Sequence, residues 1–120
     1  MNQLELAWDT FYFHTEQICY QESEYINLTQ TLHNLLLSDH QRHQRKRMKV
    51  KLHNCMDSLI ISYKKHIDAI SDLINLNNDL VDIPEEYEID VSHLGSLKSL
   101  TIKLIEETIS SKEEINNLLS

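Results

Sequence analysis

Most of the positive charge of this chain lies in one short stretch, residues 39–53, with the sequence DHQRHQRKRMKVKLH. The stretch holds six of the eleven Lys and Arg residues, although the whole chain has a formal net charge of −8. Clustered cations can pair with carboxylates of their own fold, with an acidic partner or with the phosphates of a nucleic acid. The cationic segment, as these six residues are called below, comprises Arg42, Arg45, Lys46, Arg47, Lys49 and Lys51.

The negative charge is gathered elsewhere. Residues 1–37 contain five carboxylates and no Lys or Arg, and a second acidic group surrounds Pro84. Because the two signs are separated, we predict that the cationic segment meets carboxylates of its own fold or of a bound protein, and that the acidic surfaces bind a basic partner. Aromatic side chains next to the acids would add contact area. The residues that we predict to bind a partner are Tyr12, Phe13, Glu16, Glu22, Glu24, Glu85, Glu86, Glu88 and Asp90.

Nucleic acid is the alternative partner. Six cations are enough for phosphate contacts, but the overall charge is negative and no aromatic residue interrupts the cationic segment for base stacking. The segment RMKVKLH, from Arg47 to His53, has an Arg and a His at a spacing that resembles the R-x(4–6)-H motif of the HEPN ribonucleases. The resemblance implies a helical protein that cleaves RNA across a dimer, with Arg47 stabilising phosphate charge and His53 moving protons. Met48 stands where that family commonly has a polar residue.

His40 and His43 are three residues apart, so they share one helical face and suggest a metal site. Such a site needs further ligands from facing helices, and the remaining histidines lack the paired Glu-x-x-His spacing of di-iron bundles. We therefore expect no metal and no other cofactor. His66 falls on an apolar stripe, and we expect it to be a hydrogen-bonded histidine of the interior.

The composition predicts an all-α fold. A chain of 120 residues with one Gly and one Pro has few of the residues that the turns of a sheet require. Apolar residues recur every three or four positions through most of three segments, which predicts helices at about 2–37, 39–79 and 93–118. Residues on these stripes, which we expect to be buried, include Leu4, Trp8, Ile26, Met48, Leu52, Ser62, Leu73, Ile109 and Leu118. We expect a turn near Ser38 and a cap of the third helix at Ser92. An acidic linker, 80–92, separates the second from the third because Pro84 cannot continue a helix. All 120 residues are expected to form one domain.

Three long amphipathic helices bury their apolar stripes only by packing together, so we predict an antiparallel, up-down-up bundle. The third predicted helix is shorter than the second, which leaves part of the long pair uncovered. This difference predicts a homodimer or a bound partner. Cys19 and Cys55 lie among apolar neighbours and are expected to be buried free thiols.

The first residues do not resemble a signal peptide, and no apolar run reaches the length of a membrane span, so we expect a cytoplasmic protein without membrane contact. The sequence therefore favours a small acidic helical protein that is not an enzyme and acts by binding another protein. Inhibitors, immunity proteins, antitoxins, chaperones and adaptors belong to that class. Binding or cleavage of RNA through residues 42–53 is the alternative.

Overall fold

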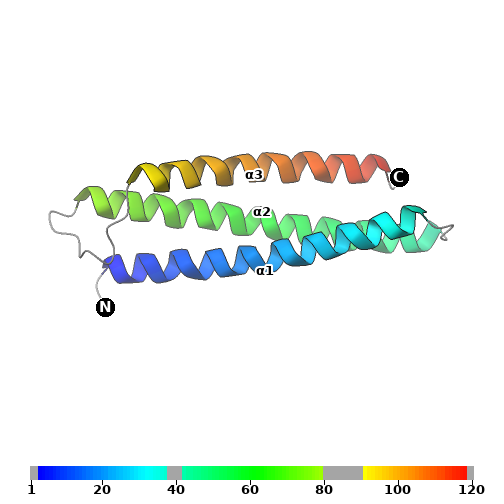
Figure 1. The fold of residues 1–120 in the computed structure, drawn as a ribbon, viewed down its shortest axis with the longest axis horizontal. Helices are drawn as coiled ribbons and strands as arrows, with labels where there is room; N and C mark the ends of the chain where they lie inside the picture. Colours follow the sequence, from blue (N-terminus) through cyan, green and yellow to red (C-terminus); the bar gives the residue numbers. More distant parts are fainter. Residues whose placement is uncertain (1–2, 38–41, 80–90, 119–120) are drawn as a thin grey trace.

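The protein is a bundle of three α-helices in the computed structural model, which describes residues 3–37, 42–79 and 91–118. Helix α1 spans Gln3–Leu37, α2 spans Arg42–Asp79 and α3 spans Val91–Leu118. The helices run up, down and up along a body that measures 63 × 23 × 17 Å (Figure 1). The predicted all-α bundle is confirmed, whereas the predicted turn near residue 38 and the linker at 80–90 lie outside the described residues.

Helix α3 begins at Val91, earlier than the predicted start near residue 93. The helix already includes Val91, so Ser92, which we predicted to be its cap, lies inside it. Ser is a favoured cap type, but so is the Asp at position 90, and residue type alone does not choose between neighbours.

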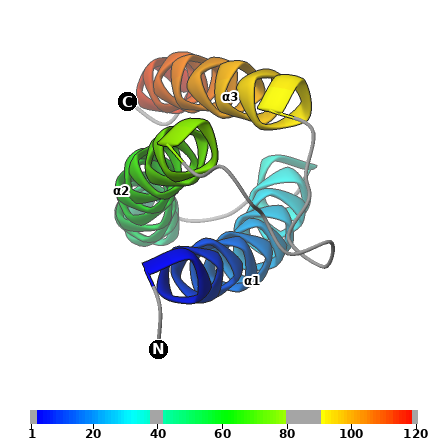
Figure 2. The ribbon, with the colours of Figure 1, turned by 90° about the vertical axis from the view of Figure 1, so that its left-hand side faces the viewer.

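Helix α2 lies between the other two helices and packs against both (Figure 2). Within the described ranges, no Cα atom of α1 comes within 8 Å of a Cα atom of α3. The outer helices therefore depend on α2 for close backbone packing, and they meet each other only through side chains.

The deepest part of the core belongs to α2. The largest fully buried side chains all come from this helix, at positions separated by three or four residues or by whole turns, and they are Leu52, Met56, Leu59, Ile70 and Leu73. Leu32 and Ile115 join this stripe near the end of α1, and Trp8 and Leu94 join it near the start of α1. Such spacing places the buried residues on one side of α2, where both neighbours reach them.

Several residues predicted to be buried are exposed. Ile26, Ile109 and Leu118 have exposed fractions of 54%, 45% and 56%, and the Cys19 thiol is also exposed. The prediction treated each stripe as covered across its full width. Because α1 and α3 each pack closely on one helix only, the edges of their stripes remain in water. Cys55 is buried, and both cysteines are free, as predicted.

His66 is an interior residue with an exposed fraction of 5%, and its ring stacks on that of Phe11 at 5.0 Å between centroids. Its Nδ1 atom has no hydrogen-bond partner in the described part of the chain, which differs from the hydrogen-bonded interior histidine that we predicted. Burial, and secondarily the nearby His14, lower the pKa of His66. The residue is therefore neutral in the folded protein at neutral pH.

None of the three described helices is both long and apolar enough to span a membrane.

Replacing Leu52 by Ala should lower the free energy of unfolding by about 2–5 kcal/mol, because it opens a cavity at a fully buried position of α2. Val50→Ala is the matched control: Val50 lies two residues away with 59% of its surface exposed, and its loss should change stability by no more than about 0.5 kcal/mol. Urea unfolding followed by circular dichroism measures both. Equal effects of the two changes would contradict the assignment of Leu52 to the core.

The lowered pKa of His66 predicts a pH dependence of stability. Below the ordinary value of 6.5 the unfolded chain binds a proton at this residue that the folded chain resists, so the free energy of unfolding falls as pH decreases from there. The His66→Gln variant should lose this part of the pH dependence, whereas His33→Gln, at an exposed position, should keep it. Urea unfolding at a series of pH values tests this, and an unchanged slope in His66→Gln would refute it.

Candidate functional site

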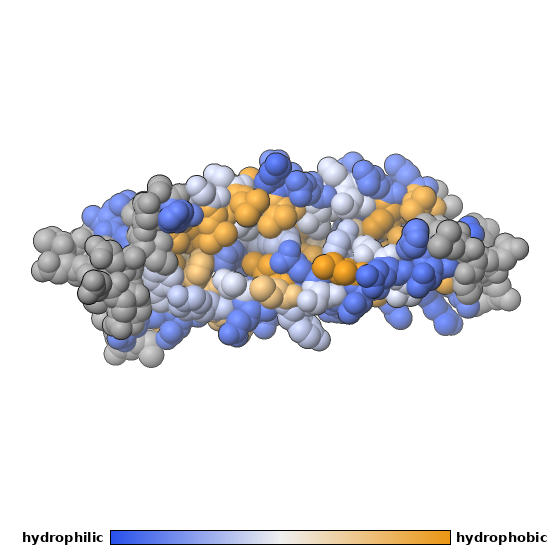
Figure 3. Space-filling model, viewed as in Figure 1, coloured by the Kyte–Doolittle hydropathy of each residue, from blue (hydrophilic) through white to orange (hydrophobic). Residues whose placement is uncertain are grey.

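The open face of the bundle has α1 and α3 as its walls and α2 as its floor, and apolar surface is visible between the two outer helices in Figure 3. At this face lies a hollow of about 270 Å³, named here the α1–α3 groove. It is lined by Glu22, Tyr25, Ile26, Leu59, Tyr63, Leu104, Glu107, Thr108 and Ser111.

Tyr63 places a polar group, its hydroxyl, at the floor of the groove. Its side chain is 3% exposed, and its hydroxyl donates a hydrogen bond to Oε2 of Glu22 at 3.1 Å. Burial raises the pKa of Tyr63 most, and the negative charges of Glu22 and, less strongly, Glu107 raise it further. The phenol therefore stays protonated at neutral pH, so it acts as a hydrogen-bond donor and not as a base.

The walls of the groove carry negative charge without a cation. Glu22 belongs to α1 and is half-buried, whereas Glu107 belongs to α3 and is exposed. No Lys, Arg or His lines the groove. The only ion pair between described residues joins Lys112 Nζ to Asp57 Oδ1 at 2.6 Å, and neither partner lines the groove. The site thus combines apolar surface with two uncompensated carboxylates.

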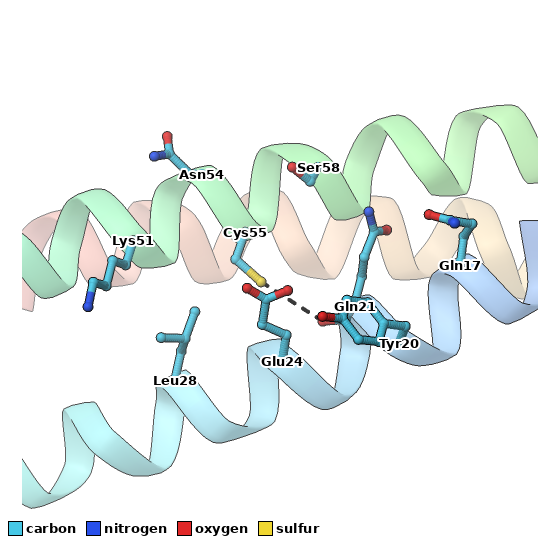
Figure 4. A pocket seen from close by; sticks show the side chains of 9 residues that line it. All are labelled: Gln17, Tyr20, Gln21, Glu24, Leu28, Lys51, Asn54, Cys55 and Ser58. Carbon is cyan, nitrogen blue, oxygen red and sulfur yellow. Dashed lines mark hydrogen bonds between the residues drawn. The ribbon is translucent and has the colours of Figure 1, made fainter.

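A second hollow, of about 550 Å³, lies between α1 and α2 (Figure 4). It holds Cys55, whose thiol donates to the backbone oxygen of Gln21 at a sulfur–oxygen distance of 3.9 Å. Burial, followed by the charge of Glu24, raises the pKa of Cys55, so the thiol is protonated and a poor nucleophile at neutral pH. The lining is mostly polar: Gln17, Tyr20, Gln21, Glu24, Leu28, Lys51, Asn54, Cys55 and Ser58.

Of these two hollows, the α1–α3 groove is the better candidate for a binding site. The larger hollow is lined mostly by polar side chains, and it contains no activated nucleophile. The groove exposes apolar side chains, which gain most from being covered by a ligand.

The predicted partner-binding residues are spread over several surfaces. Glu22 lies in the groove, but Glu24 lines the other hollow and Glu16 lines neither. Tyr12 and Phe13 are both 56% exposed, as predicted, and Tyr12 also stacks on Trp8 at 5.6 Å. The predicted residues Glu85, Glu86, Glu88 and Asp90 lie outside the described residues.

Two residues of the groove were missed by the sequence analysis. Tyr63 follows Leu59 by four residues, so it fits the apolar stripe of α2 as well as its neighbour Ser62, the residue that we predicted to be buried there. The structure buries both. Glu107 follows Leu104 by three residues, a spacing that places a charge beside the apolar stripe of α3. That spacing was a usable signal for a charged groove wall.

The cationic segment surrounds the start of α2. Consecutive residues of a helix are turned by about 100°, so its cations project to all sides and do not form one flat face. Arg45, Lys46, Arg47 and Lys51 are exposed, and Lys49 is half-buried. None of these five forms an ion pair with a carboxylate in the parts of the chain that the structure describes, so the predicted internal pairing is not seen there. The Arg42 side chain lies outside the described set.

The chemistry suggested for Arg47 and His53 gains no support within one chain. Six helical residues turn by about 600°, which leaves the two side chains about 120° apart around α2. Arg47 is exposed, whereas His53 is half-buried. Cleavage or binding of RNA remains a prediction.

His40 and the side chain of His43 lie outside the described residues. Within the three helices no group of three or more His, Cys, Asp or Glu side chains is arranged to hold a metal ion.

Comparisons with models of known protein families, with curated proteins and with solved structures find no match to this chain.

The two cysteines should react at very different rates. Cys19 is exposed, whereas Cys55 is buried and its pKa is raised, so a thiol reagent at neutral pH should modify Cys19 quickly and Cys55 only after unfolding. Single Ser replacements identify each thiol, and mass spectrometry with and without urea measures the labelling. Rapid labelling of Cys55 in the folded Cys19→Ser variant would contradict its position.

Proposed function

We propose that this protein acts by binding another protein, and that the α1–α3 groove receives an amphipathic helix of that partner. The observation that carries the proposal is an apolar groove that remains open between the two outer helices. Ile26 at its edge is 54% exposed, and Tyr25 and Leu104 are half-buried beside the buried Leu59. A helix bound along this face would cover these side chains and would pack with the three helices of this protein as the fourth helix of a bundle.

The shape of the site favours a helix over a small molecule. Its walls are two helices that run in the same direction, with the third helix as the floor (Figure 2). An amphipathic helix binds such grooves by placing side chains from successive turns into them. Tyr25, which is half-buried in the lining, supplies aromatic surface with a polar end, and such side chains are typical of those that contribute most to protein interfaces.

The proposal is tested by placing a charge at the edge of the groove. Ile26→Asp introduces a carboxylate at a position that is already half exposed, so the bundle should fold, but a bound apolar helix should be displaced. We expect the wild-type protein, immobilised and exposed to a lysate of its native cell, to retain a protein that Ile26→Asp loses. Mass spectrometry identifies what is retained.

Ile109→Asp is the matched control. Ile109 is 45% exposed on α3 but does not line the groove, so this variant should retain the same protein as the wild type. Circular dichroism verifies that both variants are helical. Equal retention by the two variants, or retention of nothing by the wild type, would count against the groove as the binding site.

A further inference from the structure

We propose that the helix bound in the α1–α3 groove carries a basic residue, Arg or Lys, that inserts between Glu22 and Glu107 above Tyr63. This inference rests on the proposed function and specifies the chemistry of the partner. The occupant is thus an amphipathic helix of another protein whose apolar stripe is interrupted by one cation.

Each outer helix places one carboxylate in the groove. Glu22 and Glu107 stand on opposite walls, and both lie close enough to Tyr63 to disfavour its ionisation. Glu22 already accepts the hydrogen bond of Tyr63 at 3.1 Å, so the phenol holds this carboxylate at the floor of the groove. When an apolar helix covers the site, both charges lose water, and burying an unpaired carboxylate is costly. A helix that supplies a cation at this level avoids that cost.

Among the side chains that the structure describes, no cation lines the groove. Lys103 precedes Glu107 by one turn of α3, yet it is exposed and forms no ion pair with any described residue. Lys112 is paired with Asp57. The cationic segment is distant, since its nearest member, Lys51, precedes Tyr63 by twelve residues, or ~18 Å along α2. The counter-charge therefore has to come from the bound helix.

A second copy of this chain is a poor occupant of the groove. In a symmetric dimer that joins the two grooves at this level, Glu22 and Glu107 of one copy would face the same two carboxylates of the other. Like charges brought together in an interface oppose association. The predicted homodimer, if it forms, should use a different surface.

Arg fits the site better than Lys. Its planar guanidinium has five N–H donors and can bond two carboxylates at once, whereas the ammonium of Lys is a compact point charge. The groove volume of about 270 Å³ leaves room for a long side chain between the walls. We expect the order of preference Arg, then Lys, then a neutral residue, and finally Glu.

The probes that test this inference are synthetic amphipathic peptides of about 18 residues, or ~27 Å as a helix, with Leu along one face and uncharged polar residues elsewhere. They differ at one central position of the Leu face, which is Arg, Gln or Glu. Fluorescence anisotropy at low salt measures their affinity for the whole protein. We expect the Arg peptide to bind about tenfold more tightly than the Gln peptide, and the Glu peptide to bind most weakly.

The Glu22→Gln, Glu107→Gln double variant should lose the preference for the Arg peptide over the Gln peptide, because no carboxylate is left to pair with the buried cation. Gln at position 22 keeps an acceptor for Tyr63, so the floor of the groove is preserved. The matched control is Glu106→Gln, Glu114→Gln, which removes two exposed carboxylates of α3 that do not line the groove and should keep the preference for Arg. Thermal unfolding verifies that both variants are folded. If the Glu22→Gln, Glu107→Gln variant does not fold, the relative affinities of the three peptides for the wild-type protein test the inference.

The outcomes separate the two proposals. Equal binding of the Arg and Gln peptides to the wild type would overturn the inference but leave the groove as a binding site. Loss of the preference for Arg in the control variant would overturn it as well. Saturable binding by none of the three peptides would count against the groove itself, and with it against the proposed function.

Discussion

The whole structure depends on burying one side of α2 under two neighbours at once. All of the largest fully buried side chains come from this helix, whereas α1 and α3 contribute residues that reach toward it. The reason is geometric, because the middle helix of a row has two partners and each outer helix has one. The packing energy of Leu52, Leu59 and Ile70 therefore holds both outer helices, and polar contacts between helices add little. The single described ion pair, between Lys112 and Asp57, is partly exposed and has a correspondingly small effect.

The same arrangement explains why the groove exists. In a closed bundle, the inner edges of α1 and α3 would meet each other, and Ile26 would be buried. Here their backbones stay apart, so that apolar side chains and two carboxylates remain at the surface above Tyr63. The burial of Tyr63 and the exposure of Ile26 are thus two results of one packing geometry. Most of the positive charge of the chain lies at the start of α2, away from this acidic site, and no described cation lines the groove.

The sequence predicted the number, order and direction of the helices because their periodic apolar stripes are long and Gly and Pro are scarce. It also identified Leu4, Trp8, Met48, Leu52 and Leu73 as core residues, and the structure buries all of them. The groove was less predictable. Glu22 was singled out with other carboxylates of α1, but periodicity does not reveal which side of α1 faces α3. Ile26 and Ile109 were assigned to the core because a stripe does not show how many neighbours cover it. Glu24 follows Glu22 by only two residues, and yet it faces a different hollow, since two helical residues turn by about 200°.

The separation of the α1 and α3 backbones also has a consequence for cooperativity. A fluctuation that lifts α3 leaves the interface between α1 and α2 in place, and the reverse holds for α1, so the outer helices can open as separate units. Only displacement of α2 disrupts both interfaces. A ligand that touches both walls of the groove would link these units, and local opening of either helix would then have to break contacts with the ligand as well.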